Sequence, residues 1–214
     1  MRFLIVGDDQ HLDMVKSKFG EKWEYDLTML VDDVADCSGY DVIMDFVIHE
    51  YPEHFESYAA LENSIVLLNS VFNSLGELYF TFGKKPAHLF GFNGLPGFFE
   101  NEVWEISTID ADMELLNQLD IDYVAVSDRV GLVTPRVVCM IINEAFYTVQ
   151  EGTASKADID SAMKLGTNYP FGPFEWLDRI GLANVHELLE ALYQDTKEGR
   201  YKIAPLLKQE YLLS

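Results

Sequence analysis

Cysteine, basic residues and long apolar runs are all scarce in this sequence. The 214 residues include only two cysteines, Cys37 and Cys139, which lie in unrelated segments without metal-ligand spacing. We therefore expect no metal site, and each cysteine is interpreted as a small buried apolar side chain. No apolar stretch reaches the roughly 18 residues that a membrane-spanning helix needs. The first residues also lack the basic, apolar and small-residue series of a signal peptide, so we expect a cytoplasmic protein without a membrane partner.

The shortage of basic residues bears on the ligands that the protein can take. Its 15 Lys and Arg residues face 36 Asp and Glu residues, which gives a formal net charge of −21. This charge raises the work of bringing a polyanion to the surface, so nucleic acid is not an expected partner. Because salt screens charges beyond about 8 Å, NAD and coenzyme A are disfavoured only by carboxylates close to their site.

Short apolar runs bounded by Gly, Asp, Asn or Pro fill the first 127 residues. Such runs are typical of strands buried on both faces of a parallel sheet. They lie at Arg2–Val6, Tyr25–Val31, Asp41–Val47, Ser64–Leu68, Ala87–Phe92, Glu102–Ser107 and Tyr123–Val126. Helical spacings lie between them, at His11–Phe19, Pro52–Leu61, Leu75–Phe82 and Ala111–Leu119. The alternation predicts an α/β domain over residues 1–127.

The remaining residues, 128–214, read as a helical domain. Val130–Gln150 has apolar residues on most turns, so this helix needs covering on several sides. Ser155 with Asp158 resembles a capping box and begins a helix that ends at Gly166. Further helices are expected at Phe174–Ile180, Asn184–Gln194 and Ile203–Leu212.

The segment after the first strand is Ile5-Val6-Gly7-Asp8-Asp9-Gln10-His11-Leu12. A dinucleotide-binding turn has the pattern G-x-G-x-x-G, in which glycines let the backbone approach a pyrophosphate at a helix N-terminus. Only Gly7 is present, since Asp9 and Leu12 occupy the other two glycine positions. The carboxylates of Asp8 and Asp9 satisfy the helix dipole and repel a diphosphate. Gly7 and Asp32, about 25 residues later, remain the candidate nucleotide contacts, and we expect no resident cofactor.

Motifs in the C-terminal half resemble those of a known family. The residues are Glu144-Ala145, Glu151-Gly152, Ile159-Asp160, Gly166 and the run Tyr169-Pro170-Phe171-Gly172-Pro173-Phe174-Glu175-Trp176-Leu177-Asp178-Arg179-Ile180-Gly181-Leu182. They resemble the N-E-A, E-G, D-I-D and P-x-G-P-f-x-l-x-D-x-x-G-L motifs of the helical domain of 3-hydroxyacyl-CoA dehydrogenases. More faintly, Asp41–Asp45 resembles the family's D-l-V-I-E strand and Phe92–Pro96 its F-N-P-V-P segment.

The resemblance implies a two-domain fold. The expected architecture is a shortened Rossmann-like α/β domain of the NAD-binding type, followed by an all-α domain of the 6-phosphogluconate-dehydrogenase C-terminal type. Because the helical domain dimerises in this family, a homodimer is predicted.

The resemblance also implies a site, which the sequence has altered. In the family a His–Glu pair moves the proton of the substrate hydroxyl while NAD takes the hydride, and a Ser and an Asn bind the reacting group. Matching Phe92-Asn93 to the family's F-N places Phe90 at the His position. Val71 then takes the Ser position and Pro135 the Asn position, while Glu102 matches the Glu.

Two hypotheses follow. The first is a non-catalytic homologue, a pseudoenzyme that binds an acyl-CoA or a partner enzyme. The second is an active NAD-dependent dehydrogenase of fatty-acid metabolism with a rearranged site. Its proton carrier would be His88, paired with Glu100 or Glu102, or a group that the sequence does not reveal. Asn69, Ser70 and Asn93 are candidate substrate contacts at strand ends, the alternative being turn capping. We interpret two further histidines as surface or capping groups, namely His49 and His54.

Overall fold

The computed structural model describes residues 1–214 and divides into two compact units. The sheet unit comprises Met1–Gly94 and Phe99–Leu132, and the helical unit comprises Leu95–Phe98 and Val133–Ser214. The boundary lies five residues beyond the predicted one, since Gly131 N donates to Val71 O at 2.7 Å within the sheet unit. None of the helices combines the length and apolar character that crossing a bilayer requires.

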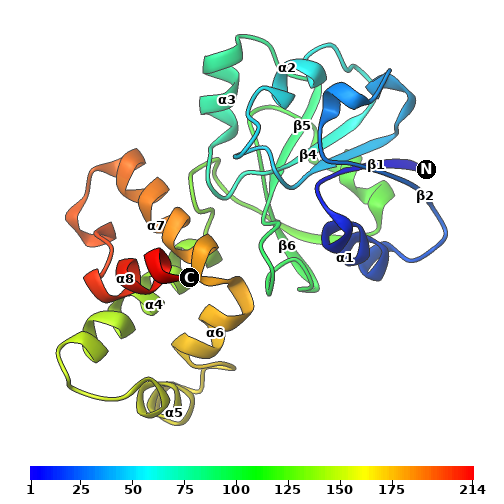
Figure 1. Ribbon diagram of the computed structural model, residues 1–214. Coiled ribbons are helices and arrows are strands. Elements are labelled where there is room, and N and C mark those ends of the chain that lie inside the picture. Colours follow the sequence, from blue (N-terminus) through cyan, green and yellow to red (C-terminus); the bar gives the residue numbers. More distant parts are fainter. The chain divides into compact units, whose positions relative to one another are not determined.

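A seven-stranded sheet forms the sheet unit (Figure 1). Its order is β2-β1-β3-β4-β5-β6-β7, and every pair is parallel except β5 with β6. The strands are β1 (Arg2–Val6), β2 (Glu24–Thr28), β3 (Val42–Asp45), β4 (Ile65–Asn69), β5 (His88–Phe92), β6 (Val103–Thr108) and β7 (Asp122–Ala125). Each of the seven predicted runs overlaps one of these strands, and the predicted α/β class is confirmed.

The sheet lacks one strand that a complete dinucleotide-binding sheet has beside its second strand. In the usual order 3-2-1-4-5-6, a further strand pairs with the second one. Here β2 is the edge, because two 3₁₀ turns, Val31–Asp33 and Cys37–Gly39, lead directly from β2 to β3. Leu27 and Met29 are therefore partly exposed at this edge, at 36% and 42%.

Two apolar clusters pack on the faces of the sheet because successive strand residues alternate in direction. One cluster contains Phe3, Phe90 and Trp104 and includes residues of α1 (Asp9–Phe19). The other contains Leu4, Tyr58 and Leu78, from β1, α2 (His54–Tyr58) and α3 (Leu75–Phe82).

Two predicted helices differ in the structure. The helix expected at Pro52–Leu61 is reduced to α2, because the flanking turns close between residues three apart, as in Phe55 N to Pro52 O. The segment expected as a helix at Ala111–Leu119 is a 3₁₀ helix over Met113–Leu119.

The helical unit contains α4 (Thr134–Gln150), α5 (Lys156–Thr167), α6 (Pro173–Ile180), α7 (Leu182–Thr196) and α8 (Pro205–Leu213). The first of these starts four residues later than predicted. Gly131 and Leu132 have φ values of +81° and +44°, which no α-helix accommodates, and Pro135 lies in the first turn of α4. Burial raises the pKa of the Cys139 thiol to about 12, as expected of a packed, unreactive cysteine.

Gly172 gives the helical unit a close contact before α6. Asp160 Oδ1 accepts from Phe174 N at 2.8 Å, and Glu175 Oε2 accepts from Gly172 N at 2.9 Å. A Cβ at Gly172 would lie 2.3 Å from Asp160 Oδ1. The glycine of the motif is therefore required by the close approach of Asp160.

Replacing Gly172 by alanine is predicted to destabilise the helical unit by about 1–3 kcal/mol, because the new methyl group overlaps the Asp160 carboxylate. Urea unfolding followed by far-UV circular dichroism measures the loss. Gly166→Ala is the matched control, since a Cβ there meets nothing and alanine favours the helix. Equal midpoints for the two variants would contradict the prediction.

Candidate functional site

The candidate site lies at the carboxyl edge of the parallel strands. Open α/β sheets bind ligands outside this edge. Gly7 follows β1 there, Asp45 ends β3, Asn69 ends β4 and Asn93 follows β5. The parallel register places these strand ends side by side.

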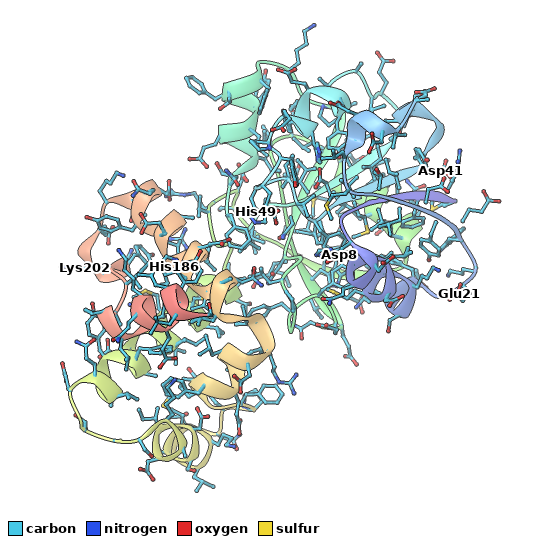
Figure 2. All side chains as sticks on the ribbon, viewed as in Figure 1. Asp8, Glu21, Asp41, His49, His186 and Lys202 are labelled. Atoms are coloured by element: carbon cyan, nitrogen blue, oxygen red, sulfur yellow. The ribbon has the colours of Figure 1, made fainter.

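The first turn of α1 is capped by two side chains. Asp8 is the N-cap (Figure 2), and its Oδ1 accepts from His11 N at 3.1 Å. In return, Asp8 N donates to His11 Nδ1 at 3.2 Å. The expected role of Asp8 at the helix terminus is confirmed, whereas sequence reasoning missed His11.

The His11 imidazole fills the open face of Gly7. A Cβ at Gly7 would lie 2.7 Å from His11 Nδ1, and the imidazole also lies against Phe46, with ring centroids 4.6 Å apart. Phe46 in turn packs on Phe92 and Phe99, at 5.2 and 5.5 Å. A dinucleotide needs this glycine face for its pyrophosphate. The residues around Gly7, including the carboxylates of Asp8 and Asp9, therefore do not fit a pyrophosphate.

The second candidate nucleotide contact, Asp32, lies in the Val31–Asp33 turn that follows β2, with an exposed side chain. Asp32 makes no hydrogen bond or ion pair with Gly7 or His11, and its role stays a prediction.

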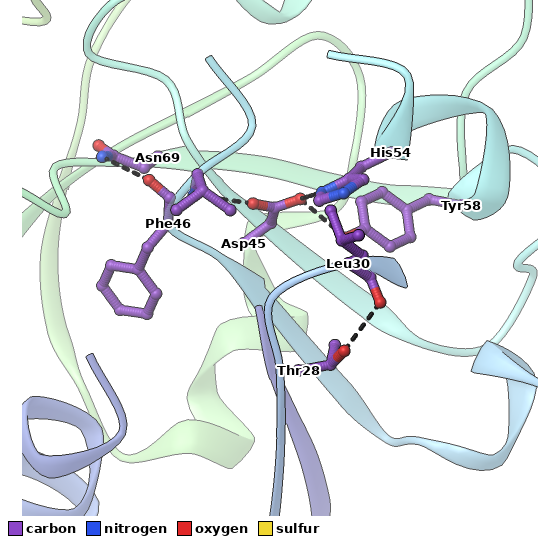
Figure 3. Close-up of polar contacts among 8 residues, drawn as sticks. Thr28, Leu30, Asp45, Phe46, His54, Tyr58 and Asn69 are labelled. Atoms are coloured by element: carbon purple, nitrogen blue, oxygen red, sulfur yellow. Dashed lines mark hydrogen bonds and ion pairs between the residues drawn. The ribbon is translucent and has the colours of Figure 1, made fainter. Parts of the chain in front are cut away.

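A buried carboxylate network lies behind the same edge (Figure 3). Asp45 is fully buried, and its Oδ1 accepts from Val47 N at 2.9 Å. Its Oδ2 accepts from Tyr58 OH at 2.8 Å and lies 3.0 Å from His54 Nδ1. Burial, and then the Asp45 charge, hold the pKa of Tyr58 well above its ordinary value.

The interpretation of His54 as a surface or capping group was wrong, because this side chain is only 3% exposed. The reason is physical: a carboxylate inside an apolar cluster needs donors, and His54 is one of them. The available signal was Asp45 itself, an acid that ends the apolar run of β3.

Asn69 braces two loops. Its Nδ2 donates to Phe46 O at 3.2 Å, and its Oδ1 accepts from Gly94 N at 3.0 Å. Both hydrogen bonds are of the turn-capping kind that the sequence left as an alternative to ligand binding. Asn93 is buried beside this loop, at 9% exposure.

Ser70 carries a buried hydroxyl without a hydrogen-bond partner, as does Ser107 on β6. A Cβ on Gly91 would lie 2.2 Å from Ser70 Oγ and 2.5 Å from Ser107 Oγ. The glycine therefore leaves room for both hydroxyls inside the sheet.

The structure does not bring His88 and Glu102 together. His88 begins β5 and pairs with Ile65 at the start of β4, on the edge opposite the candidate site. Glu102 precedes β6, which is antiparallel, with its end at Thr108 opposite Phe90. About eight residues of extended strand, roughly 26 Å, separate the two positions, so they cannot share a proton.

Phe90, Val71 and Pro135 all have buried side chains. Phe90 is fully buried in the core cluster that contains Trp104.

His49 is an imidazole on the loop after β3. It packs on Phe72, with ring centroids 4.3 Å apart, and burial lowers its pKa. Contrary to the surface interpretation, its side chain is only 17% exposed.

Removal of the Asp45 carboxylate by an Asp45→Ala change is predicted to cost about 3–5 kcal/mol, because it leaves buried donors unpaired. Tyr58→Phe should cost about 1–2 kcal/mol through the loss of one hydrogen bond. Urea unfolding followed by tryptophan fluorescence in a Trp176→Phe background measures both, since Trp23 and Trp104 then report the sheet unit.

The control for these variants is Asp33→Asn, a change to an exposed acid that is expected to stay within about 0.5 kcal/mol. An Asp45→Ala variant as stable as this control would show that the network contributes little.

Comparison with known proteins supports the family resemblance of the C-terminal motifs and the α/β fold. The family model of the 3-hydroxyacyl-CoA dehydrogenase C-terminal domain matches residues 131–212. Over 88 residues, 41% of the chain, the sequence is 46% identical to 3-hydroxyadipyl-CoA dehydrogenase of Escherichia coli K12. Over 154 residues, 68% of the chain, it is 33% identical to 3-hydroxybutyryl-CoA dehydrogenase of Clostridioides difficile. The matches span 18% and 54% of the lengths of these relatives.

Solved structures share the fold. FadB2 of M. tuberculosis has a TM-score of 0.78 at 16% identity, and the match covers 99% of this chain and 93% of that one. (S)-3-hydroxybutyryl-CoA dehydrogenase from Ralstonia eutropha has a TM-score of 0.71 at 21% identity, with the same coverage. Through its C-terminal domain, the chain therefore belongs to the 3-hydroxyacyl-CoA dehydrogenase family.

Proposed function

We propose that this 3-hydroxyacyl-CoA dehydrogenase-like protein binds an acyl-CoA thioester without oxidising it. One observation carries the proposal: Phe90 is fully buried in the core, at the position that the family resemblance gives to the proton-carrying histidine. A general base must lie within hydrogen-bond reach of the proton that it abstracts. A phenyl ring has no atom that can do so.

Two further positions support a role without hydride transfer. Val71 and Pro135 stand at the positions of the Ser and Asn that bind the reacting group in the family. Neither side chain can donate or accept a hydrogen bond. The closed turn at Gly7 adds a separate obstacle on the dinucleotide side.

An active NAD-dependent 3-hydroxyacyl-CoA dehydrogenase is the second candidate function. The names of the Escherichia coli and Clostridioides difficile relatives favour it, since each names a dehydrogenase. It needs another proton carrier, and His49 is an imidazole on the loop after β3. Burial lowers the pKa of His49, which keeps this imidazole neutral and able to accept a proton at pH 7.

Turnover and binding assays separate the two candidates. We expect acetoacetyl-CoA to bind in calorimetry, with no NADH consumption when the two are mixed. Turnover that His49→Gln reduces by about 10²-fold or more, while the matched His186→Gln change leaves it intact, would establish the second candidate instead. Absence of any acyl-CoA binding would overturn the first candidate and leave a partner enzyme as the ligand.

We also propose a homodimer formed by the helical unit. Val133, the residue before α4, and Val137 on α4 are each 51% exposed, and Leu165 on α5 is 89% exposed. An apolar hollow of about 220 Å³ lies in this unit, lined by Val138, Ile141, Ile142, Tyr169, Pro170, Pro173 and Trp176. Exposed apolar surface of this kind favours burial against another copy.

Sedimentation velocity tests the dimer. The unmodified chain is expected at twice its monomer mass, and Val137→Glu is expected to shift it to a monomer by placing a charge in the interface. Phe80→Glu, on the exposed face of α3 in the sheet unit, is the control and should leave the dimer intact. A monomeric unmodified chain would refute the proposal.

A further inference from the structure

We infer that the His11 imidazole blocks the turn between β1 and α1 and thereby excludes dinucleotides from a fold that otherwise accepts them. This side chain is called the plug below. The inference concerns the NAD site and is independent of the acyl ligand proposed above. It rests on three kinds of observation: the space that the imidazole fills, the hydrogen bonds that hold it there, and the charges around it.

The imidazole contacts both the glycine of the turn and a buried aromatic ring. A Cβ at Gly7 would lie 2.7 Å from Nδ1, 3.0 Å from Cγ and 3.2 Å from Cβ of His11. The ring of Phe46, which is 1% exposed, lies against the imidazole with the ring centroids 4.6 Å apart. Because Phe46 packs on Phe92 and Phe99, it has little room to move away from the imidazole. The histidine itself therefore occupies the space that glycine opens.

Polar contacts with Asp8 hold the imidazole there. His11 Nδ1 accepts from Asp8 N at 3.2 Å, and it lies 2.7 Å from Asp8 Oδ1. Moving the imidazole out of the turn would therefore break both contacts.

Charge adds to this obstruction. A pyrophosphate that displaced the imidazole would break the cap at the helix N-terminus and would meet the carboxylates of Asp8 and Asp9 at close range. The backbone amides of Asp8 and His11, which a phosphate would otherwise contact, already have partners.

The plugging groups are separable from the rest of the fold. The Asp8 side chain is 49% exposed and that of His11 is 23% exposed, and neither residue belongs to the two core clusters of the sheet unit. Replacing them should therefore open the turn while the sheet stays folded.

NADH titration tests the plug, with energy transfer from tryptophan to NADH and calorimetry as the readouts. We expect no saturable binding of NADH by the unmodified chain. The variant Asp8→Ser/Asp9→Gly/His11→Ala keeps a capping hydroxyl but removes the imidazole and two charges, and it should bind NADH at least about tenfold more tightly. His11→Ala alone should give a smaller gain and serves if the triple variant does not fold.

A double variant of neighbouring acids, Asp13→Asn/Glu21→Gln, controls for the loss of two charges near α1 without a change in the turn. Micromolar NADH binding by the unmodified chain would overturn the plug, as would folded variants that bind no more tightly than this control. NADH binding without turnover would leave the proposed acyl-CoA function standing, so the two failures are distinguishable.

Discussion

A carboxylate buried in an apolar sheet must find donors, and the candidate site follows from how Asp45 finds them. The two oxygens of Asp45 take Val47 N, Tyr58 OH and His54, which fixes the course of the chain immediately after β3. Phe46 lies within that segment, and Asn69 ties its carbonyl oxygen to the loop after β5. Phe46 then backs the His11 imidazole. Through Phe46, the buried Asp45 on β3 thus helps to determine how His11 closes the turn after β1.

The helical unit depends on a different set of contacts, which are local to it. Asp160 and Glu175 accept backbone hydrogen bonds at the start of α6, and Asn143 on α4 binds the chain before α8 through Ala204 N at 2.9 Å. These interactions pack and cap helices, and they need no ligand. The motifs that identify the family lie mostly in this unit, where the family model matches residues 131–212.

The sequence was most informative where periodicity and capping decide the structure. The buried runs of β1, β3 and β4 and the capping box at Ser155 could be read directly, because burial and cap chemistry act over a few residues. The start of α4 could not, since two left-handed residues, Gly131 and Leu132, are set by contacts within the sheet unit.

The site was harder still to predict. The network of Asp45 with His54 joins residues nine positions apart through a loop whose path no pattern indicates. The pairing of His88 with Glu102 was misleading for a related reason: sequence proximity to a strand says nothing about which end of the sheet a residue occupies once β6 turns antiparallel.

A hydride-transfer site must keep open space for two ligands and must hold polar groups that are satisfied only when those ligands arrive, which costs stability. The edge described above does the opposite. Its glycine face is filled by His11, its buried acid is fully hydrogen-bonded, and Phe90 has joined the core. The buried hydroxyls of Ser70 and Ser107 lack partners, and both lie inside the sheet beside Gly91. The edge is thus packed like an ordinary protein interior, and this packing is the observation on which the proposed binding role depends.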